Sequence, residues 1–188
     1  ITFIFFGSTL SSKSSKIKYS KDEISNYFSG MVSLKQNYTR SAFKYLNKVQ
    51  SIKDIHSNYK IEFIRTLVLL EKYDDAIKFS KSIWLEEEFV FETDLLLGLN
   101  SLVEENYEMA KKHFLRIKDN PSSNLLFQEF LGNILLAWNE ASQKNTIESL
   151  DFFNKISNRF LNIKNIQNCF FQCYFDTEDT KSHFENLV

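Results

Sequence analysis

The 188-residue chain is 43% hydrophobic and contains 19 Phe and 8 Tyr, which is ample for a folded core and excludes a disordered chain. Its 4 Gly and 1 Pro are too few for the many turns of an all-β protein, so an all-α fold is predicted. A formal net charge of −1 excludes the strongly basic surface by which proteins bind nucleic acid, so no nucleic-acid partner is expected.

Residues 1–20 differ in composition from the rest of the chain. An apolar run, ITFIFF, precedes small polar residues, as in the downstream half of a secretory signal with cleavage after Ser11. A buried strand or the end of a membrane anchor is the alternative, although the run is too short to span a bilayer. Residues 1–20 are therefore predicted to be a residual signal peptide or anchor with a linker. Lysine greatly outnumbers arginine, as in proteins from AT-rich bacterial genomes. Because of the signal-like start, we expect an exported protein of the bacterial periplasm or envelope.

From Lys21 onward, apolar residues recur with the period of an amphipathic helix. Residues 24–34 and 38–49 each have one apolar face, which predicts two helices joined by a short turn. Residues 59–70 and 73–83 repeat this arrangement. The first half of the chain is therefore predicted to form two helical hairpins.

The strongest pattern lies within residues 94–117. Gly98 follows a leucine, and Tyr107, Ala110 and Phe114 come after it at intervals of nine, three and four residues. Equivalent positions recur at spacings of 35 and 34 residues: Tyr38, Tyr73 and Tyr107 at the aromatic position, and Ser41, Ala76 and Ala110 at the small position. Small side chains at a fixed interval allow antiparallel helices to pack closely, which predicts a series of hairpins.

These residues resemble the tetratricopeptide repeat, whose consensus has Leu-Gly, Tyr, a small residue and an aromatic residue at the same offsets. The resemblance implies a right-handed superhelical α-solenoid of antiparallel helix pairs over residues 21–188. Related α-hairpin repeats, such as the pentatricopeptide type, share the geometry, but that type is expected to be basic and this chain is not. The expected units are 21–54, 55–88, 89–121, 122–159 and an incomplete 160–188, and the chain is expected to be a fragment of a longer array.

Two units depart from the consensus at the glycine position. The second unit has Ile64 there, and Ser80 at the later aromatic position. The first unit has Ser29 or Gly30, depending on a one-residue shift that the sequence leaves open. The resemblance is therefore clearest in the third unit.

The fourth unit departs in its length. Leu131-Gly132 repeats Leu97-Gly98 at a spacing of 34 residues, but the next small and aromatic residues, Ser149 and Phe153, come five residues late. We therefore expect the first helix of this unit to be longer than the others.

No motif for catalysis, cofactor binding or metal binding is found. The chain has no phosphate-binding glycine loop, no nucleophile elbow, and no HExxH or CxxC motif. The three histidines, His56, His113 and His183, are scattered, and we expect them to be solvated or to cap helices. Two cysteines are too few for a disulfide framework. The protein is therefore predicted to be non-enzymatic, with no cofactor and no metal site.

Two further features have structural interpretations. Glu86–Glu88 precede the third unit, where carboxylates stabilise the N-terminus of the next helix, and contact with a basic peptide is the alternative. Trp138 lies among apolar residues, which favours a place in the core over a ligand platform.

In tetratricopeptide proteins the first helix of each unit lines a concave face that holds peptides. The resemblance maps that face onto Asn26, Tyr27, Glu62, Arg65, Leu95, Leu96, Leu99, Glu129, Phe130 and Asn133. These positions lack the set of Lys, Arg and Asn that grips a peptide carboxylate, so an apolar or amphipathic partner segment is expected. The alternative is that the three leucines are buried by the neighbouring unit or by a continuing superhelix.

Together these patterns predict a non-enzymatic scaffold for protein–protein contacts in the bacterial cell envelope, with a partner of unknown identity. The alternative is a helical repeat module of a larger enzyme or of a transport or assembly machine, whose active part lies outside this chain. Residues 1–20 would place either protein near a membrane.

Overall fold

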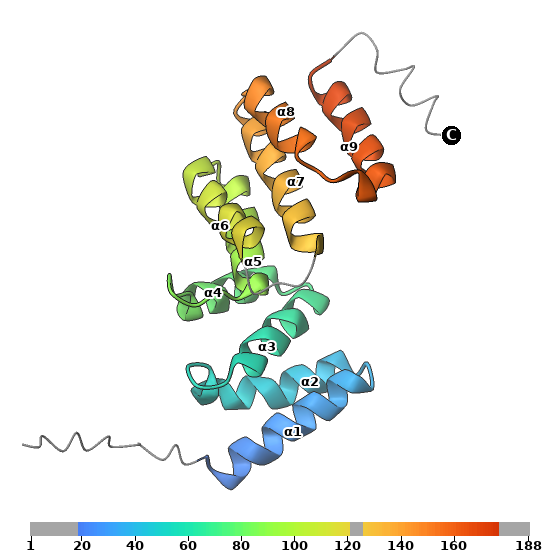
Figure 1. The fold of residues 1–188 in the computed structure, drawn as a ribbon. Coiled ribbons are helices and arrows are strands. Elements are labelled where there is room, and N and C mark those ends of the chain that lie inside the picture. Colours follow the sequence, from blue (N-terminus) through green and yellow to red (C-terminus); the bar gives the residue numbers. More distant parts are fainter. Residues whose placement is uncertain (1–18, 121–125, 177–188) are drawn as a thin grey trace, which may run out of the picture.

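The computed structural model describes residues 19–120 and 126–176, and of Leu126–Glu129 the backbone alone. Every element in these two ranges is a helix, which confirms the predicted all-α class (Figure 1). The α-helices are α1 (Lys21–Lys35), α2 (Thr39–Leu46), α3 (Ser57–Leu69), α4 (Tyr73–Ile83), α5 (Phe91–Val103), α6 (Tyr107–Asp119), α7 (Leu126–Ser142), α8 (Thr146–Asn154) and α9 (Leu161–Tyr174), with 3₁₀ turns η1 (Asn47–Ile52) and η2 (Asn158–Phe160).

Helices that are neighbours in sequence are also neighbours in space. From α1 to α8 each helix packs mainly on the helices before and after it, and α9 contacts η2, so that the chain runs from α1 and α2 at one end to α8 and α9 at the other (Figure 1). The buried apolar residues of the described ranges form three clusters along this row, one in α2–α4, one between α6 and α7, and one in α7–α9. The interior is therefore built between neighbours and is not a single closed core.

The predicted units contain these helices in pairs. The pairs α1–α2, α3–α4, α5–α6 and α7–α8 fall within 21–54, 55–88, 89–121 and 122–159. The signal-like residues 1–18 and the expected second helix of the last unit, within 177–188, lie outside the described residues. Tyr19 and Ser20 are described, and Ser20 caps α1 through a reciprocal capping box with Glu23. None of the helices described is long and apolar enough to cross a bilayer.

A left-handed residue ends the first helix of each pair. Asn37, Glu71, Glu105 and Lys144 have φ values of 60°, 58°, 58° and 63°, at spacings of 34, 34 and 39 residues. The next residue donates its N–H back across the turn, as in the 2.8 Å bonds from Tyr38 to Ser33 O and from Asn106 to Ser101 O. These are the bonds of a Schellman cap, which reverses the chain after a helix and satisfies its last carbonyls.

The turns set the register of the second helices and correct one prediction. Tyr38 precedes α2 as its N-cap, whereas Tyr73 and Tyr107 are the first residues of α4 and α6. The small position of the first unit is therefore Ala42, which is fully buried, and not Ser41, which is exposed. Counted from the turn, the small residues are Ala42, Ala76, Ala110 and Ser149, all fully buried.

A small and a large residue, 16 positions apart, meet where the paired helices cross. A Cβ added to Gly30 would lie 2.6 Å from Leu46 Cδ2, and one added to Gly98 would overlap the Phe114 ring. This contact assigns Gly30, and not Ser29, to the glycine position of the first unit. In the second pair the sizes are exchanged, with Ile64 on α3 and Ser80 on α4 at the same two positions.

In the fourth pair Ala137, and not Gly132, takes the small position. Ser149 Oγ donates a hydrogen bond of 2.9 Å to Ala137 O, which joins α8 to α7 at the crossing. Gly132 lies instead against α6, where an added Cβ would be 2.6 Å from Lys118 Cβ. The five extra residues of α7 therefore move the crossing toward its C-terminus, and Gly132 serves the contact with the preceding pair.

Moving the large residue of the second crossing from α3 to α4 should restore part of the stability that each single substitution removes. Ile64→Ala leaves a cavity and should lower the free energy of unfolding by about 3 kcal/mol, and Ser80→Phe overpacks the crossing at a cost of about 2 kcal/mol. The double variant has the same small–large combination as Ala137 and Phe153 in the fourth pair. Its loss of unfolding free energy should therefore be about 2 kcal/mol smaller than the sum of the losses in the two single variants. Urea denaturation measures all three, and strictly additive losses would contradict the pairing.

Glycine at a left-handed turn should stabilise the protein. Glu105 has φ 58°, which costs a non-glycine residue about 1 kcal/mol, so Glu105→Gly should raise the free energy of unfolding by about 0.5 kcal/mol after the added chain entropy. Glu104→Gly is the matched control, because it removes the same charge from a neighbouring residue whose φ of −78° is ordinary for a non-glycine residue. Glu104→Gly should lower stability by about 0.5–1 kcal/mol, and a loss in both variants would contradict this account.

Candidate functional site

An apolar groove of about 830 Å³ lies between α3, the start of α4 and α5. Its walls include Val68 and Leu69 from α3, Ile77 from α4, and Leu95, Leu99 and Val103 from α5. Several of these side chains face solvent, with exposed fractions of 39% for Leu99 and 83% for Val103. We call this feature the groove.

The groove follows from two properties of the sequence. The α5 helix has leucines on more than one face, so residues remain apolar after Leu97 and Gly98 are buried against α6. The α3–α4 pair also packs less extensively than the α1–α2, α5–α6 and α7–α8 pairs, in keeping with the bulk of Ile64 at its crossing. Ile64 itself lies at the base of the groove, where it lines the cavity.

Charged groups mark the two ends of the groove. At one end Arg65 on α3 pairs with Glu92 on α5, with Nη2 and Nε at 2.7 and 3.0 Å from Glu92 Oε1, and its Nη1 lies 3.4 Å from Glu62. At the other end Asp74 lines the groove in the first turn of α4. The Arg65–Glu92 pair ties α3 to α5 without closing the apolar stretch between the two ends.

The groove brings together four of the predicted site residues: Arg65, Leu95, Leu96 and Leu99. Glu62 lies beside them through its contact with Arg65. Leu95 and Leu96 are half-buried and Leu99 is exposed, so the neighbouring unit covers the three leucines only in part within the described residues. Their burial by a continuing superhelix stays the alternative prediction.

The other predicted site residues lie elsewhere. Tyr27 packs on His56, with ring centroids 4.6 Å apart, and the Asn26 amide donates to Asp22 O within α1. Phe130 and Asn133 are interior, with exposed fractions of 4% and 1%, since Phe130 stacks on Phe160 of η2. The side chain of Glu129 lies outside the described residues. The longer α7 explains this difference, because its early turns lie under η2 and not on an open face.

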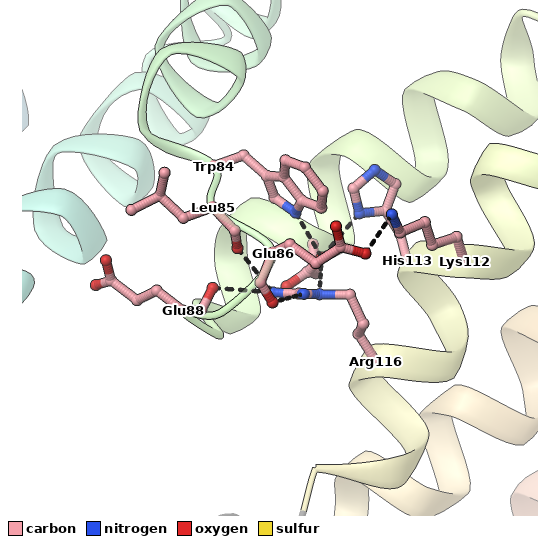
Figure 2. Close-up of polar contacts among 8 residues, drawn as sticks. Trp84, Leu85, Glu86, Glu88, Lys112, His113 and Arg116 are labelled. Atoms are coloured by element: carbon pink, nitrogen blue, oxygen red, sulfur yellow. Dashed lines mark hydrogen bonds and ion pairs between the residues drawn. The ribbon is translucent and has the colours of Figure 1, made fainter.

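Sequence reasoning missed a buried polar cluster where α4 passes into α5 (Figure 2). Asp94 of α5 is fully buried, and its Oδ1 lies 3.2 Å from Trp84 Nε1, 2.8 Å from His113 Nδ1 and 3.0 Å from Arg116 Nε. The prediction of a solvated or capping His113 is therefore wrong, whereas His56 does cap α3 by accepting from Tyr59 N–H. Three donors around one carboxylate offset the cost of burying its charge.

Arg116 also fixes the α4–α5 junction, which we define as residues 84–90. Its guanidinium donates to the carbonyl oxygens of Leu85, Glu86 and Glu88, and Figure 2 shows these bonds converging on one side chain. The guanidinium carbon and Lys112 Nζ lie 5.3 and 5.2 Å from the Trp84 ring centroid, within range of cation–π attraction.

The acidic run of the junction pairs with lysines from other helices. Glu88 accepts two bonds of 2.8 Å from the buried Lys60 of α3, and Glu86 lies 2.7 Å from Lys112 of α6, whose hydrogen bond lowers the pKa of that carboxyl. Val90 is the N-cap of α5 and makes no side-chain cap bond, so the predicted stabilisation of this N-terminus by the run stays a prediction about charge near the helix end. The run itself forms ion pairs with α3 and α6.

The cluster has the contacts of a structural junction. Trp84 and Arg116 donate hydrogen bonds to the same Asp94 oxygen that His113 contacts. In the part of the chain described, no hydrogen bond joins His113 to a Ser, Thr or Cys, the residues that a catalytic histidine activates. Across the same residues, no three His, Cys, Asp or Glu side chains gather as a metal site would require. The one sequence signal for the cluster is His113 and Arg116, three positions apart on one helix face.

No protein family model, curated protein or solved structure matches this chain. Inference about function therefore starts from the groove, the junction and the recurring turns of the chain itself.

Removal of the Arg116 guanidinium should destabilise the fold. Arg116→Met keeps much of the side-chain length but takes donors from Asp94 and from three carbonyls, so it should lower the free energy of unfolding by about 3 kcal/mol. Lys112→Met is the matched control on the same helix, and the loss of its exposed pair with Glu86 should cost much less than the loss of the Arg116 guanidinium. Urea denaturation compares the two variants, and equal losses would contradict a structural role for Arg116.

Proposed function

We propose that this chain is a non-enzymatic, tetratricopeptide-like scaffold that holds a segment of a partner protein in the groove. The proposal includes the right-handed superhelical stacking that such arrays have. Its support is the recurrence of one turn at spacings of 34, 34 and 39 residues, together with small residues at fixed positions after each turn. Packing between neighbours, without a single closed core, is typical of repeat arrays.

The groove is the observation that carries the binding function. Soluble proteins rarely leave contiguous apolar surface in contact with water unless it meets another molecule. Here Leu69, Leu99 and Val103 are exposed around a cavity whose volume suits several apolar side chains. A partner segment that buried these side chains would be stabilised by removing their apolar surface from water.

We further propose that the scaffold acts in the bacterial cell envelope. Support comes from the sequence of residues 1–11, with its apolar run followed by small residues, as in an export signal. The balance of charge also favours a protein partner over nucleic acid.

Peptide selection tests the binding function. Displayed 12-residue random peptides selected on the wild-type protein should be rich in large apolar residues, and Leu99→Glu should weaken their binding by at least about tenfold. Ile147→Glu is the matched control, because Ile147 is also exposed but lies on α8, away from the groove. Fluorescence anisotropy gives the affinities, and thermal unfolding shows that both variants are folded. Peptides that bind Leu99→Glu as tightly as wild type would contradict the proposal.

A further inference from the structure

We propose that the occupant of the groove is a basic amphipathic helix of a partner protein, about three turns long, whose cationic end meets Asp74. This inference rests on the proposed function and adds the class of partner.

The backbone of the walls favours a helical occupant. The groove is bounded by α3, α4 and α5, whose main-chain groups bond within their own helices, and no strand edge exists in the described ranges. An extended segment would therefore find few main-chain partners and would bury unpaired N–H and C=O groups against leucines. A helix satisfies its own backbone and presents only side chains, so it fits an apolar groove.

The length of the groove sets the length of that helix. The lining residues of α5 run from Glu92 to Val103, which at a rise of 1.5 Å per residue corresponds to about 16 Å, or three turns. Three apolar anchors, spaced about four residues apart on one face, cover this distance. Leu95, Leu99 and Val103 lie on α5 at that same spacing of four residues, so each anchor has a counterpart.

The charges of the groove favour a cationic partner. Arg65 is the only cation among its lining residues, and it already pairs with Glu92 and Glu62. At the opposite end Asp74 is exposed and forms no ion pair within the described part of the chain. The nearby Lys72 does not pair with Asp74. It forms an ion pair with Asp75, and its Nζ lies 5.3 Å from the Phe43 ring centroid.

Further acidic residues reinforce the Asp74 end. Glu104 and Glu105 follow Val103 directly at the end of α5, and both are exposed. Opposite charges across an interface raise the association rate and exclude partners of the wrong sign. A Lys or Arg in the terminal turn of the bound helix would therefore find a carboxylate that forms no ion pair in the described part of the chain.

Two designed peptides test the class of partner. Both are 12-residue stapled helices with leucines at three anchor positions, and the last turn carries two lysines in one and two glutamates in the other. The lysine peptide should bind the wild-type protein about tenfold more tightly at low salt, and the difference should shrink as salt rises. Fluorescence anisotropy at two salt concentrations measures the affinities.

Neighbouring aspartates provide the matched pair of variants. Asp74→Asn should reduce the preference for the lysine peptide about threefold or more, whereas Asp75→Asn should leave it unchanged, because Asp75 pairs with Lys72 away from the groove. Both residues lie in the first turn of α4, so their effects on that helix are alike. A preference that survives in Asp74→Asn would overturn the assignment of the cationic end.

The remaining outcomes separate this inference from the proposed function. Equal binding of both peptides, lost in Leu99→Glu, would overturn the basic class and leave the groove as a binding site. Failure of both peptides to bind, or binding that is unaffected by Leu99→Glu, would overturn both proposals. A dimer in sedimentation velocity that Leu99→Glu dissociates would assign the groove to a second copy of the chain and would also overturn the inference.

Discussion

Close contact between one small and one large side chain at each helix crossing is the constraint on which the rest of the structure depends. Gly30 against Leu46 and Gly98 against Phe114 leave no room for an added Cβ, so the distance between the paired helices is fixed by sterics. The left-handed turns then deliver each second helix in the same register, because every one of them closes with the same pattern of main-chain bonds. The same helix pair therefore recurs along the chain, because each turn has the same geometry and the close contacts at the crossings fix how near the two helices lie.

The junction between the second and third pairs is held by charge. Lys60, Lys112 and Arg116 reach the junction from three positions on α3 and α6, and the buried Asp94 lies at its centre. One of its oxygens, Oδ2, has no hydrogen-bond partner in the described structure. The guanidinium of Arg116 keeps this carboxylate in a positive field, so removal of the cation costs far more than an exposed ion pair is worth. These contacts tie α3 and α6 to the segment that joins α4 to α5.

The sequence predicted what depends on local pattern and missed what depends on distant contacts. The helical class and the pairing of helices followed from apolar periodicity and from the spacing of Ala76 and Ala110. The shift from Ser41 to Ala42 was missed because both residues are small, and only the turn at Asn37 decides between them. The local pattern around His113 predicts a solvated or capping side chain, because it contains no sign of the buried carboxylate of Asp94 that lies across from it. Four of the predicted site residues line the groove, because the prediction counted positions from the helix register and that register holds in α3 and α5. The same count fails in the longer α7, where Phe130 and Asn133 are buried.

A partner helix in the groove would extend the packing rule of the chain to another molecule. Among the described helices from α1 to α8, each packs on its neighbours in sequence, and the glycines at two of the crossings set how closely the helices approach. At the second crossing the large residue lies on the first helix, so α3 and α4 pack less extensively and a surface between them and α5 stays uncovered. The leucines of α5 then face solvent at the interval at which a helix presents its own anchors. Ile64, the residue that departs from the repeat pattern at this crossing, thus lines the apolar surface from which function is inferred.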